Sequence, residues 1–348
     1  MERNTQSRIA SVTVWPYADT GIMSEEILEE VVTMNYRATG REKPVVFSWQ
    51  GDEPLRCGPD FFKTAVKLQR KHIKDKRIVN TIVTKCEGLN EEWANFFYEN
   101  NFLVGLLADG RKSFAEPALA EFDVAAPFKR LKPAAEFLKK RGVHINVIAC
   151  IDQRNVNSPI TVYNCMKEMS DYLQFHSVGK GHHAVSAEAY GEFLSRILTE
   201  WYKNDENKVY VQFIEALLSN YKGCHSGFCI FDTACGQNPV VDYEGDVYLC
   251  TRCREKGEAY IGNIMNLDLN DLLGITAEKG KCKISDLPTG CMQCKYFKVC
   301  YGGCPLNRVE NMFTGIKENA LCRSYKRLFT AFDDILRVTV ADYISYLR

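Results

Sequence analysis

The chain has 348 residues, of which 46% are hydrophobic and 25% are charged, a mixture that is typical of globular proteins and excludes intrinsic disorder. Lys and Arg together number 44 and so do Asp and Glu, so the formal net charge is zero and we expect no nucleic-acid partner. No run approaches the ~18 apolar residues of a membrane helix, and the first twenty residues lack the apolar core of a secretory signal. We therefore expect a cytoplasmic protein with no membrane partner.

Short apolar runs alternate with amphipathic stretches in the first part of the chain, which predicts strands alternating with helices. The expected strands are 9–14, 45–49, 78–83, 102–107, 143–150 and 172–175. The expected helices are one capped by Ser24, one opening at Pro59, and the ranges 91–99, 133–140, 159–169 and 187–202. This alternation predicts a parallel sheet, arranged either as a partial barrel or as a doubly wound sheet.

Cysteine is the residue type that is out of proportion. The chain has fifteen cysteines, and eleven of them lie between Cys224 and Cys322. Because disulfides are rare in a reducing cytosol, this number favours metal or redox chemistry. The change in composition predicts two domains, residues 1–222 and 223–348, with a final helix over about 323–346.

The spacing of these cysteines is typical of metal sites. Cys291 and Cys294 form a CxxC pair, and Cys300, Cys304 and Cys322 follow, while Cys229, Cys235 and Cys250 precede the pair. Thiolates two or three residues apart can bind one metal centre from a tight turn. The eight cysteines suffice for two four-thiolate sites, which we interpret as iron–sulfur clusters; two zinc ribbons or unligated structural thiols are the alternatives.

The run Cys235-x9-Gly245-x4-Cys250, followed by the later cysteines, resembles the SPASM domain of radical SAM peptide-modifying enzymes, in particular the anaerobic sulfatase-maturating enzymes. The resemblance implies two auxiliary [4Fe-4S] clusters. It assigns Cys229, Cys235, Cys250 and Cys304 to cluster I, and it assigns Cys291, Cys294, Cys300 and Cys322 to cluster II.

The resemblance continues upstream, where Phe47-Ser48-Trp49-Gln50-Gly51-Asp52-Glu53-Pro54 is similar to the family's FxxQGGEP segment. It implies a partial (β/α)6 TIM-like barrel followed by a SPASM domain, and a contact of Gly51, Asp52, Glu53 and Pro54 with the amine of S-adenosylmethionine. By the same resemblance, Glu215 matches the family's catalytic Asp.

The defining CxxxCxxC motif of radical SAM enzymes is missing, because no cysteine precedes Cys57 and residues 12–24 run directly from the first strand to the first helix. Three thiolates of that motif leave one iron free to bind S-adenosylmethionine. In addition, Asp52 replaces a glycine of the family motif. We therefore expect that the parent radical reaction is lost and that S-adenosylmethionine is not a cofactor.

Three other cysteines follow predicted strands. Cys57, Cys86 and Cys150 lie near the carboxyl ends of their strands, where barrel enzymes assemble active sites. They could form a new site, or they could be buried thiols that pack as small hydrophobes. Cys253 forms a second CxxC with Cys250, and we interpret it as a bystander that could substitute as a ligand.

Three functions fit these residues. The first is electron transfer by the two clusters to a redox partner. The second is a pseudoenzyme in which structural clusters support binding of a peptide or an active homologue. The third is a redox enzyme with a new site at the barrel mouth.

Overall fold

The computed structural model describes residues 9–40, 42–108, 123–178, 184–310 and 315–346, without the side chains of residues 282 and 338–346. Its contacts divide the chain into two compact units. The first unit comprises Met1–Leu107, Leu131–Asn146 and Ala234–Ser285, and the second comprises Ala108–Arg130, Val147–Thr233 and Asp286–Arg348. The boundary predicted at residue 222 falls inside the second unit, just after α7 (Gln212–Tyr221), and the two-domain division stays a prediction.

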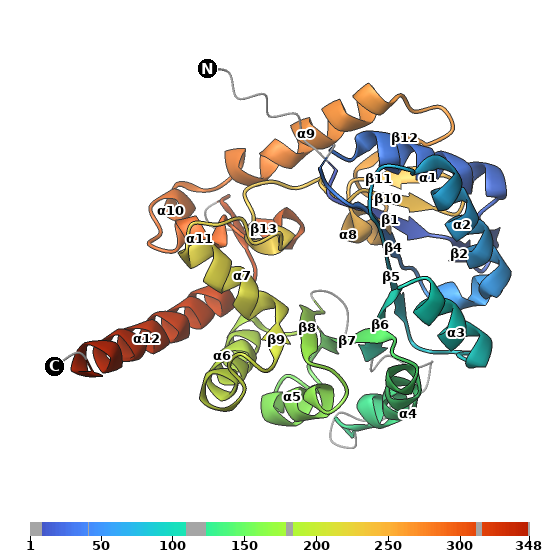
Figure 1. Ribbon diagram of the computed structural model, residues 1–348. Helices are drawn as coiled ribbons and strands as arrows, with labels where there is room; N and C mark the ends of the chain where they lie inside the picture. The colour runs from blue at the N-terminus through green and yellow to red at the C-terminus, as the bar shows by residue number, and fades with distance from the viewer. Residues whose placement is uncertain (1–8, 41, 109–122, 179–183, 311–314, 347–348) are drawn as a thin grey trace. The chain divides into compact units, whose positions relative to one another are not determined.

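A mostly parallel sheet forms the centre of the first unit (Figure 1). Strands β1, β4, β5 and β6 are parallel neighbours, β10 pairs in parallel with β1, and β11 and β12 continue the sheet in antiparallel fashion. The spatial order is β12 (Tyr260–Asn263), β11 (Asp246–Tyr248), β10 (Val240–Asp242), β1 (Val12–Trp15), β4 (Val45–Trp49), β5 (Ile78–Thr84) and β6 (Leu103–Ala108). Because β10 pairs with β1, part of the cysteine-rich region completes the sheet begun by the first strand.

Helices of the first unit bury apolar faces next to this sheet. The fully buried Trp49 packs against Phe62 of α2, with ring centroids 5.2 Å apart, and Phe62 packs in turn against Phe102 at 6.3 Å. Ser24 caps α1 as predicted, its hydroxyl accepting from the N–H of Ile27. The elements are α1 (Glu25–Ala38), η1 (Pro54–Cys57), α2 (Gly58–His72), α3 (Glu91–Glu99), α8 (Thr251–Lys256) and α9 (Leu269–Ser285), and the small strands β2 (Tyr17–Ala18) and β3 (Gly21–Ile22).

The second unit combines three parallel strands with helices and the cysteine-rich turns. Val147–Ile151 of β7 pairs with β8, and β8 pairs with β9. The elements are β7 (His144–Ile151), α5 (Pro159–Lys167), β8 (Tyr172–Ser177), α6 (Ala187–Asn204), β9 (Tyr210–Val211), α7, η3 (Cys229–Phe231), α10 (Thr289–Met292), α11 (Phe297–Cys300), η4 (Pro305–Asn307), β13 (Arg308–Glu310), β14 (Lys317–Asn319) and α12 (Cys322–Tyr346).

The α/β class and its parallel strands are confirmed, and most predicted elements lie within a few residues of their expected bounds. Helices α7, α8, α10 and α11 were not predicted, and two further helices also differ from the prediction. Helix α4 (Ala126–Lys140) begins before Pro133 because Phe128 and Leu131 are buried and hold the preceding turn. Helix α9 was not predicted, since its buried face includes Thr276 and Lys283 and therefore lacks a regular apolar period.

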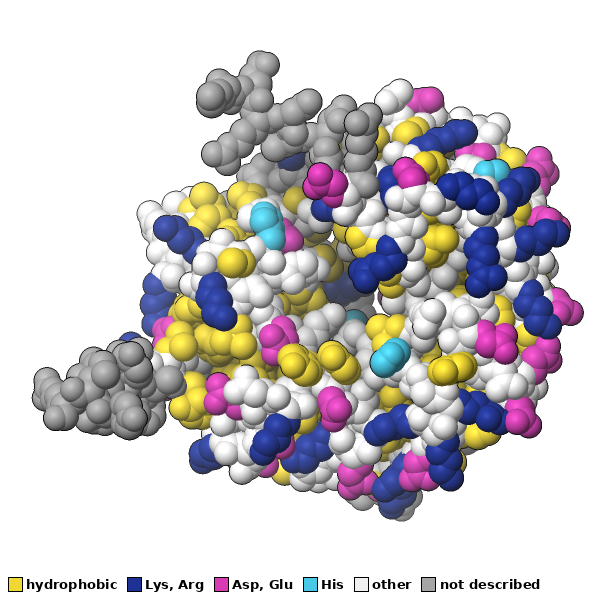
Figure 2. Space-filling model, viewed as in Figure 1, with side chains coloured by type: hydrophobic (Ala, Val, Ile, Leu, Met, Phe, Trp, Pro, Cys, Tyr) yellow, Lys and Arg dark blue, Asp and Glu magenta, His cyan; other side chains and the backbone are white. Residues whose placement is uncertain are grey.

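Charged side chains of both signs are mixed on the face of the molecule shown in Figure 2. Lys and Arg side chains are interspersed with Asp and Glu over the face in Figure 2, in keeping with their equal numbers. None of the helices in the described ranges is long and apolar enough to cross a membrane.

The packing of α12 on α6 fixes the position of Cys322, the first residue of α12. The Ser324 hydroxyl donates to the carbonyl oxygen of Ala187 at 2.6 Å. A Cβ on Gly191 would lie 2.8 Å from the Ser324 Cα, so the close approach of the two helices requires glycine at this position.

We predict that Gly191→Ala lowers the free energy of unfolding, because overpacking costs about 1–3 kcal/mol and exceeds the gain of about 1 kcal/mol from helix propensity. The matched control is Gly274→Ala in α9, where no atom lies within 4 Å of the added methyl group. Urea denaturation of both variants provides the measurement. Equal or higher stability of Gly191→Ala relative to the control would contradict the packing described.

Candidate functional site

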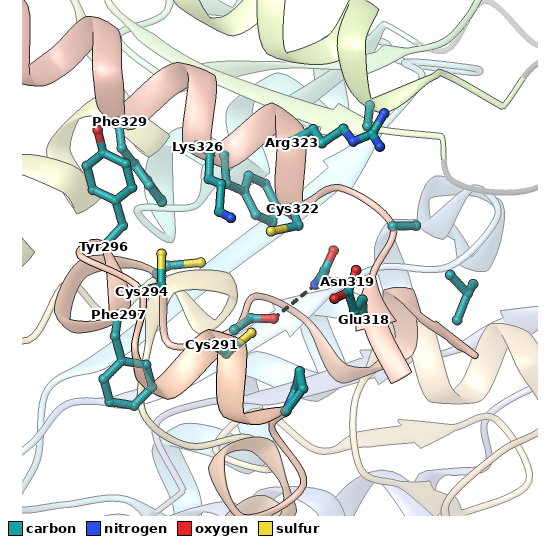
Figure 3. Close-up of a pocket in the computed structure, with 18 of the residues that line it drawn as sticks. Cys291, Cys294, Tyr296, Phe297, Glu318, Asn319, Cys322, Arg323, Lys326 and Phe329 are labelled. Carbon is teal, nitrogen blue, oxygen red and sulfur yellow. Dashed lines mark hydrogen bonds between the residues drawn. The ribbon is translucent and has the colours of Figure 1, made fainter. Parts of the chain in front are cut away.

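Four cysteines line one cavity of about 580 Å³ in the second unit (Figure 3). Cys291 lies in α10, Cys294 lies between α10 and α11, Cys300 ends α11, and Cys322 begins α12. These are the four residues assigned to cluster II by the sequence resemblance. The structure therefore brings this predicted set together from three separate helices.

Tight turns hold the cysteine-bearing segments in place. The N–H of Cys294 donates to the carbonyl oxygen of Cys291 at 3.1 Å, which closes the CxxC turn. After Cys300, the residues Tyr301, Gly302 and Gly303 have φ angles of 48°, 75° and 67° and reverse the chain. The Asn319 side chain donates to the carbonyl oxygens of Gly302 at 3.1 Å and Cys304 at 3.2 Å, and so fixes this reversal.

The four thiols influence one another electrostatically. Burial raises the pKa of Cys300 to about 12, and Cys322, Cys291 and Cys294 add to the increase. Burial and the neighbouring thiols also raise the pKa values of Cys291 and Cys322. Negative charge on all four sulfurs is therefore unfavourable unless positive charge lies among them.

This donor set suits a metal–sulfur centre. Thiolate is the ligand of iron–sulfur clusters and of zinc, and the set supplies four thiols around one space. Among the described residues, no three His, Cys, Asp or Glu side chains are grouped closely enough to hold a single metal ion.

Sequence reasoning missed the other side chains of the cavity. Tyr296 and Lys326 line it together with the cysteines, and the Tyr296 hydroxyl donates to Asp333 at 3.0 Å. Lys326 and Arg323 lower the pKa of Cys322, in opposition to its burial. The only sequence signal for these residues is their closeness to Cys294 and Cys322 in the chain.

The residues assigned to cluster I belong to both units. Cys229 and Cys304 are in the second unit, whereas Cys235 and Cys250 are in the first, and their convergence stays a prediction. In the first unit, the Cys250 and Cys253 sulfur atoms are 3.5 Å apart. The Cys253 thiol and the N–H groups of Cys253 and Arg252 lower the pKa of Cys250 to about 6. Cys253, interpreted from the sequence as a bystander that could substitute as a ligand, is therefore in contact with Cys250.

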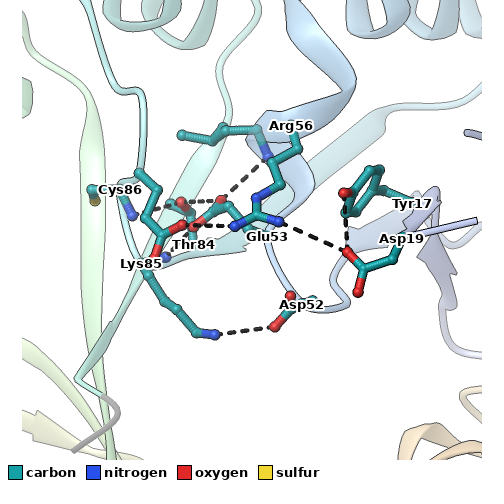
Figure 4. A network of polar contacts seen from close by, with 10 residues as sticks. Tyr17, Asp19, Asp52, Glu53, Arg56, Thr84, Lys85 and Cys86 are labelled. Carbon is teal, nitrogen blue, oxygen red and sulfur yellow. Dashed lines mark hydrogen bonds and ion pairs between the residues drawn. The ribbon is translucent and has the colours of Figure 1, made fainter. Parts of the chain in front are cut away.

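The segment after β4 forms a polar network with the end of β5 (Figure 4). Glu53 is 1% exposed, and its carboxylate accepts from the Thr84 hydroxyl at 2.6 Å and from the N–H of Lys85 at 2.8 Å. Burial raises the pKa of Glu53, and these hydrogen bonds oppose the increase. Glu53 thus connects the end of β4 to the end of β5.

The other charged side chains of this segment also have partners within the first unit. Asp52 pairs with Lys85 at 3.2 Å, and Arg56 contacts Glu87 at 3.3 Å and Asp19 at 4.0 Å (Figure 4). Asp19 lies in the turn of the small β2–β3 hairpin that connects β1 to α1.

An aromatic side chain covers the glycine of the segment. A Cβ on Gly51 would lie 3.6 Å from Trp15, the last residue of β1. The Arg254 guanidinium lies over the Trp15 ring, 4.9 Å from its centroid, and pairs with Asp242 at 3.4 Å. Pro54 is buried at the start of η1. The segment that is similar to the FxxQGGEP motif is therefore engaged in packing, hydrogen bonds and ion pairs with other residues of the first unit.

The remaining predicted residues are not shown to converge. Cys57 ends η1 and Cys86 follows β5 in the first unit, whereas Cys150 in β7 and Glu215 in α7 belong to the second. Burial raises the pKa values of the Cys57 and Cys86 thiols to about 12, as expected for packed thiols. Burial also raises the pKa of Glu215. Their proposed catalytic roles stay predictions.

The chain is thus an α/β protein with a parallel sheet and a cavity lined by four cysteines. Comparison with known proteins shows its family. No protein-family model matches the chain. A serine-type anaerobic sulfatase-maturating enzyme of Bacteroides thetaiotaomicron is 31% identical, with 94% of this chain and 83% of that protein covered. A cysteine-type enzyme of Clostridium perfringens is 30% identical, with 91% and 89% covered.

The solved structure of native anSMEcpe with bound AdoMet and Cp18Cys peptide is 28% identical to this chain. Its TM-score is 0.78, and the match covers 94% of this chain and 98% of that one. The chain belongs to the anaerobic sulfatase-maturating enzyme family, within the radical SAM proteins that carry a SPASM domain. The resemblance found in the sequence is thereby confirmed.

We predict that Cys291→Ser removes about four iron atoms per chain, because a four-thiolate cluster loses one of its ligands. The matched control is Cys224→Ser, which replaces an exposed cysteine outside the cavity and leaves the iron content unchanged. Iron and sulfide analysis of protein purified without oxygen provides the measurement. Equal iron in both variants would contradict the assignment of the cavity.

We predict that Thr84→Val destabilises the fold by about 1–3 kcal/mol at neutral pH, because the buried Glu53 carboxylate loses a donor. Burial raises the pKa of Glu53 in the folded protein above its pKa in the unfolded chain. The contribution of Glu53 to stability therefore falls as the pH rises from the unfolded-state pKa through the folded-state pKa. Loss of the donor raises the folded pKa further. Urea denaturation should therefore show a larger loss at about pH 8 than at about pH 5.

Thr81→Val is the control for that experiment, because Thr81 is on the same strand and donates only to the Ser48 hydroxyl, at 3.1 Å. It should cost about 0.5–1.5 kcal/mol at both pH values. The same pH dependence in both variants would show that Glu53 is not the responsible group.

Proposed function

We propose that this chain is an iron–sulfur protein that transfers electrons and has lost the radical chemistry of its family. The observation that carries the proposal is the cavity lined by Cys291, Cys294, Cys300 and Cys322. Four thiolates satisfy a [4Fe-4S] cluster completely. Such a centre exchanges electrons without binding a substrate at iron.

The connection from β1 to α1 supports the loss of radical chemistry. In the family this connection carries CxxxCxxC, whereas here residues 16–24 contain no cysteine and include the β2–β3 hairpin. The hairpin is joined to its surroundings, since the Thr20 and Tyr243 hydroxyls are 2.5 Å apart. The chain thus lacks three thiolates that would leave one iron open.

The segment similar to the family's S-adenosylmethionine contact also favours this proposal. Asp52 pairs with Lys85, Glu53 accepts three hydrogen bonds from Leu55, Thr84 and Lys85, and Trp15 covers Gly51. A ligand amine would have to compete with Lys85 for the carboxylates. We therefore do not assign S-adenosylmethionine as a cofactor.

The chain's own residues have definable roles in electron transfer. Cys291, Cys294, Cys300 and Cys322 would hold one cluster, and Cys229, Cys235, Cys250 and Cys304 a second; bound clusters supply one-electron redox chemistry. Lys326 and Arg323 offset negative charge near Cys322. Tyr296 and Phe329 pack 5.2 Å apart and both line the cavity, which lowers the local dielectric constant.

A second candidate function is peptide binding. A related structure contains the Cp18Cys peptide and covers 94% of this chain, so a peptide partner is a natural extension of the family likeness. In that case the clusters stabilise the fold, because metal binding contributes folding free energy. Both proposals assign the protein to the cytoplasm, where thiols remain reduced.

Anaerobically purified protein tests the proposal. We expect about eight iron and eight sulfide per chain, two one-electron steps by voltammetry, and an EPR spectrum of the reduced protein that S-adenosylmethionine does not change. Cys291→Ser should lose one redox step, and Cys224→Ser should keep both. A spectrum that changes with S-adenosylmethionine, or iron near twelve per chain, would contradict it. Peptide binding without any redox step would favour the second function.

A further inference from the structure

Cys250 and Cys253 form a thiol pair that is separate from the four-thiol cavity. The pair lies in the first unit, and the cavity residues lie in the second. Cys250 precedes the first residue of α8, and Cys253 lies within this helix, so both side chains are on one side of the same turn. Their sulfur atoms are 3.5 Å apart, in contact without a covalent bond.

This distance makes disulfide formation a small local change. A disulfide bond is about 2 Å long, so the sulfurs need to approach by about 1.5 Å. The Arg254 N–H donates to the Cys250 carbonyl oxygen at 3.0 Å, and the Glu258 N–H donates to the Cys253 carbonyl oxygen at 2.9 Å. The backbone on both sides of the pair is thus held in the conformation that keeps the thiols together.

The two thiols differ in exposure. Cys253 is 3% exposed, whereas Cys250 is only partly buried. An oxidant from solution therefore reaches Cys250 first, and Cys253 is placed to attack the sulfur of Cys250 afterwards. A more exposed thiol beside a buried resolving thiol is an arrangement that suits dithiol–disulfide exchange.

We propose that Cys250 and Cys253 are a redox-active dithiol that closes to a disulfide when Cys250 is not bound to metal. The oxidant is a small-molecule disulfide such as oxidised glutathione. Closure occupies the sulfur of Cys250, so the disulfide and metal ligation by Cys250 exclude each other. The inference goes beyond the proposed function. It concerns the metal-free protein and therefore does not depend on whether clusters form.

The exchange balances in two steps. Cys250, after losing its proton to solvent, attacks one sulfur of oxidised glutathione, so a mixed disulfide forms and one glutathione thiolate leaves. Cys253, also deprotonated, then attacks the Cys250 sulfur and displaces the second glutathione thiolate. The protein dithiol loses two electrons and two protons, and one oxidised glutathione becomes two reduced molecules.

Peptide mapping of the full-length apoprotein tests this proposal. The protein is stripped of iron anaerobically with a chelator, reduced, treated with oxidised glutathione and alkylated. Cleavage after Glu244 and Glu255 releases the peptide 245–255, which contains Cys250 and Cys253 and no other cysteine. We expect this peptide without alkyl groups and lighter by two hydrogens than its reduced form, as an internal disulfide requires.

Two variants make the result specific. In Cys253→Ser, Cys250 should retain glutathione because the resolving thiol is missing, and in Cys224→Ser the internal disulfide should form as in the parent chain. Thermal melting verifies that both variants are folded. Stable glutathione on Cys250 of the parent chain, a bond from Cys250 to another cysteine, or full alkylation of both thiols would overturn the proposal. Iron analysis before stripping reports separately on the clusters.

Discussion

Coordination number is the constraint on which the proposed chemistry depends. A cluster held by four thiolates has no iron position left for a substrate, whereas a cluster held by three does. The cavity of the second unit offers four thiols, and the connection between β1 and α1 offers none. An iron–sulfur cluster can thus transfer electrons when four thiolates hold it, and it can activate a substrate when only three do.

Electrostatics connects this constraint to folding. Burial and mutual repulsion raise the pKa values of Cys291, Cys300 and Cys322, so the cavity favours neutral thiols over thiolates. A metal–sulfur centre held by these cysteines would have to displace the thiol protons, and its positive charge would compensate the thiolates. The turn at Tyr301–Gly303 and the packing of α12 on α6 position the cysteines that line the cavity. The affinity of such a site is therefore coupled to the stability of the second unit.

Much of this architecture could be predicted from the sequence, because those features are determined by residues that are close together in the chain. Strands such as 45–49 and 78–83 have β-branched and aromatic runs, and Ser24 has the chemistry of a helix cap. The resemblance to the SPASM domain implied the set Cys291, Cys294, Cys300 and Cys322, which lines one cavity. Helix α9 escaped prediction because Thr276 and Lys283 are buried by tertiary packing. The contacts of Trp15 with Gly51 and Arg254 join three distant parts of the chain, and no local pattern encodes them.

The chain belongs to the anaerobic sulfatase-maturating enzyme family, and its segment from Gly51 to Pro54, which resembles the family's contact for the amine of S-adenosylmethionine, takes part in a network with Thr84 and Lys85. The most direct test of this account is a product assay on iron-loaded, reduced protein incubated with S-adenosylmethionine. The account predicts that neither methionine nor 5′-deoxyadenosine forms above the level of a protein-free control. Release of both products by the parent chain would contradict it, because only an iron with an open ligand position could cleave the sulfonium in this way.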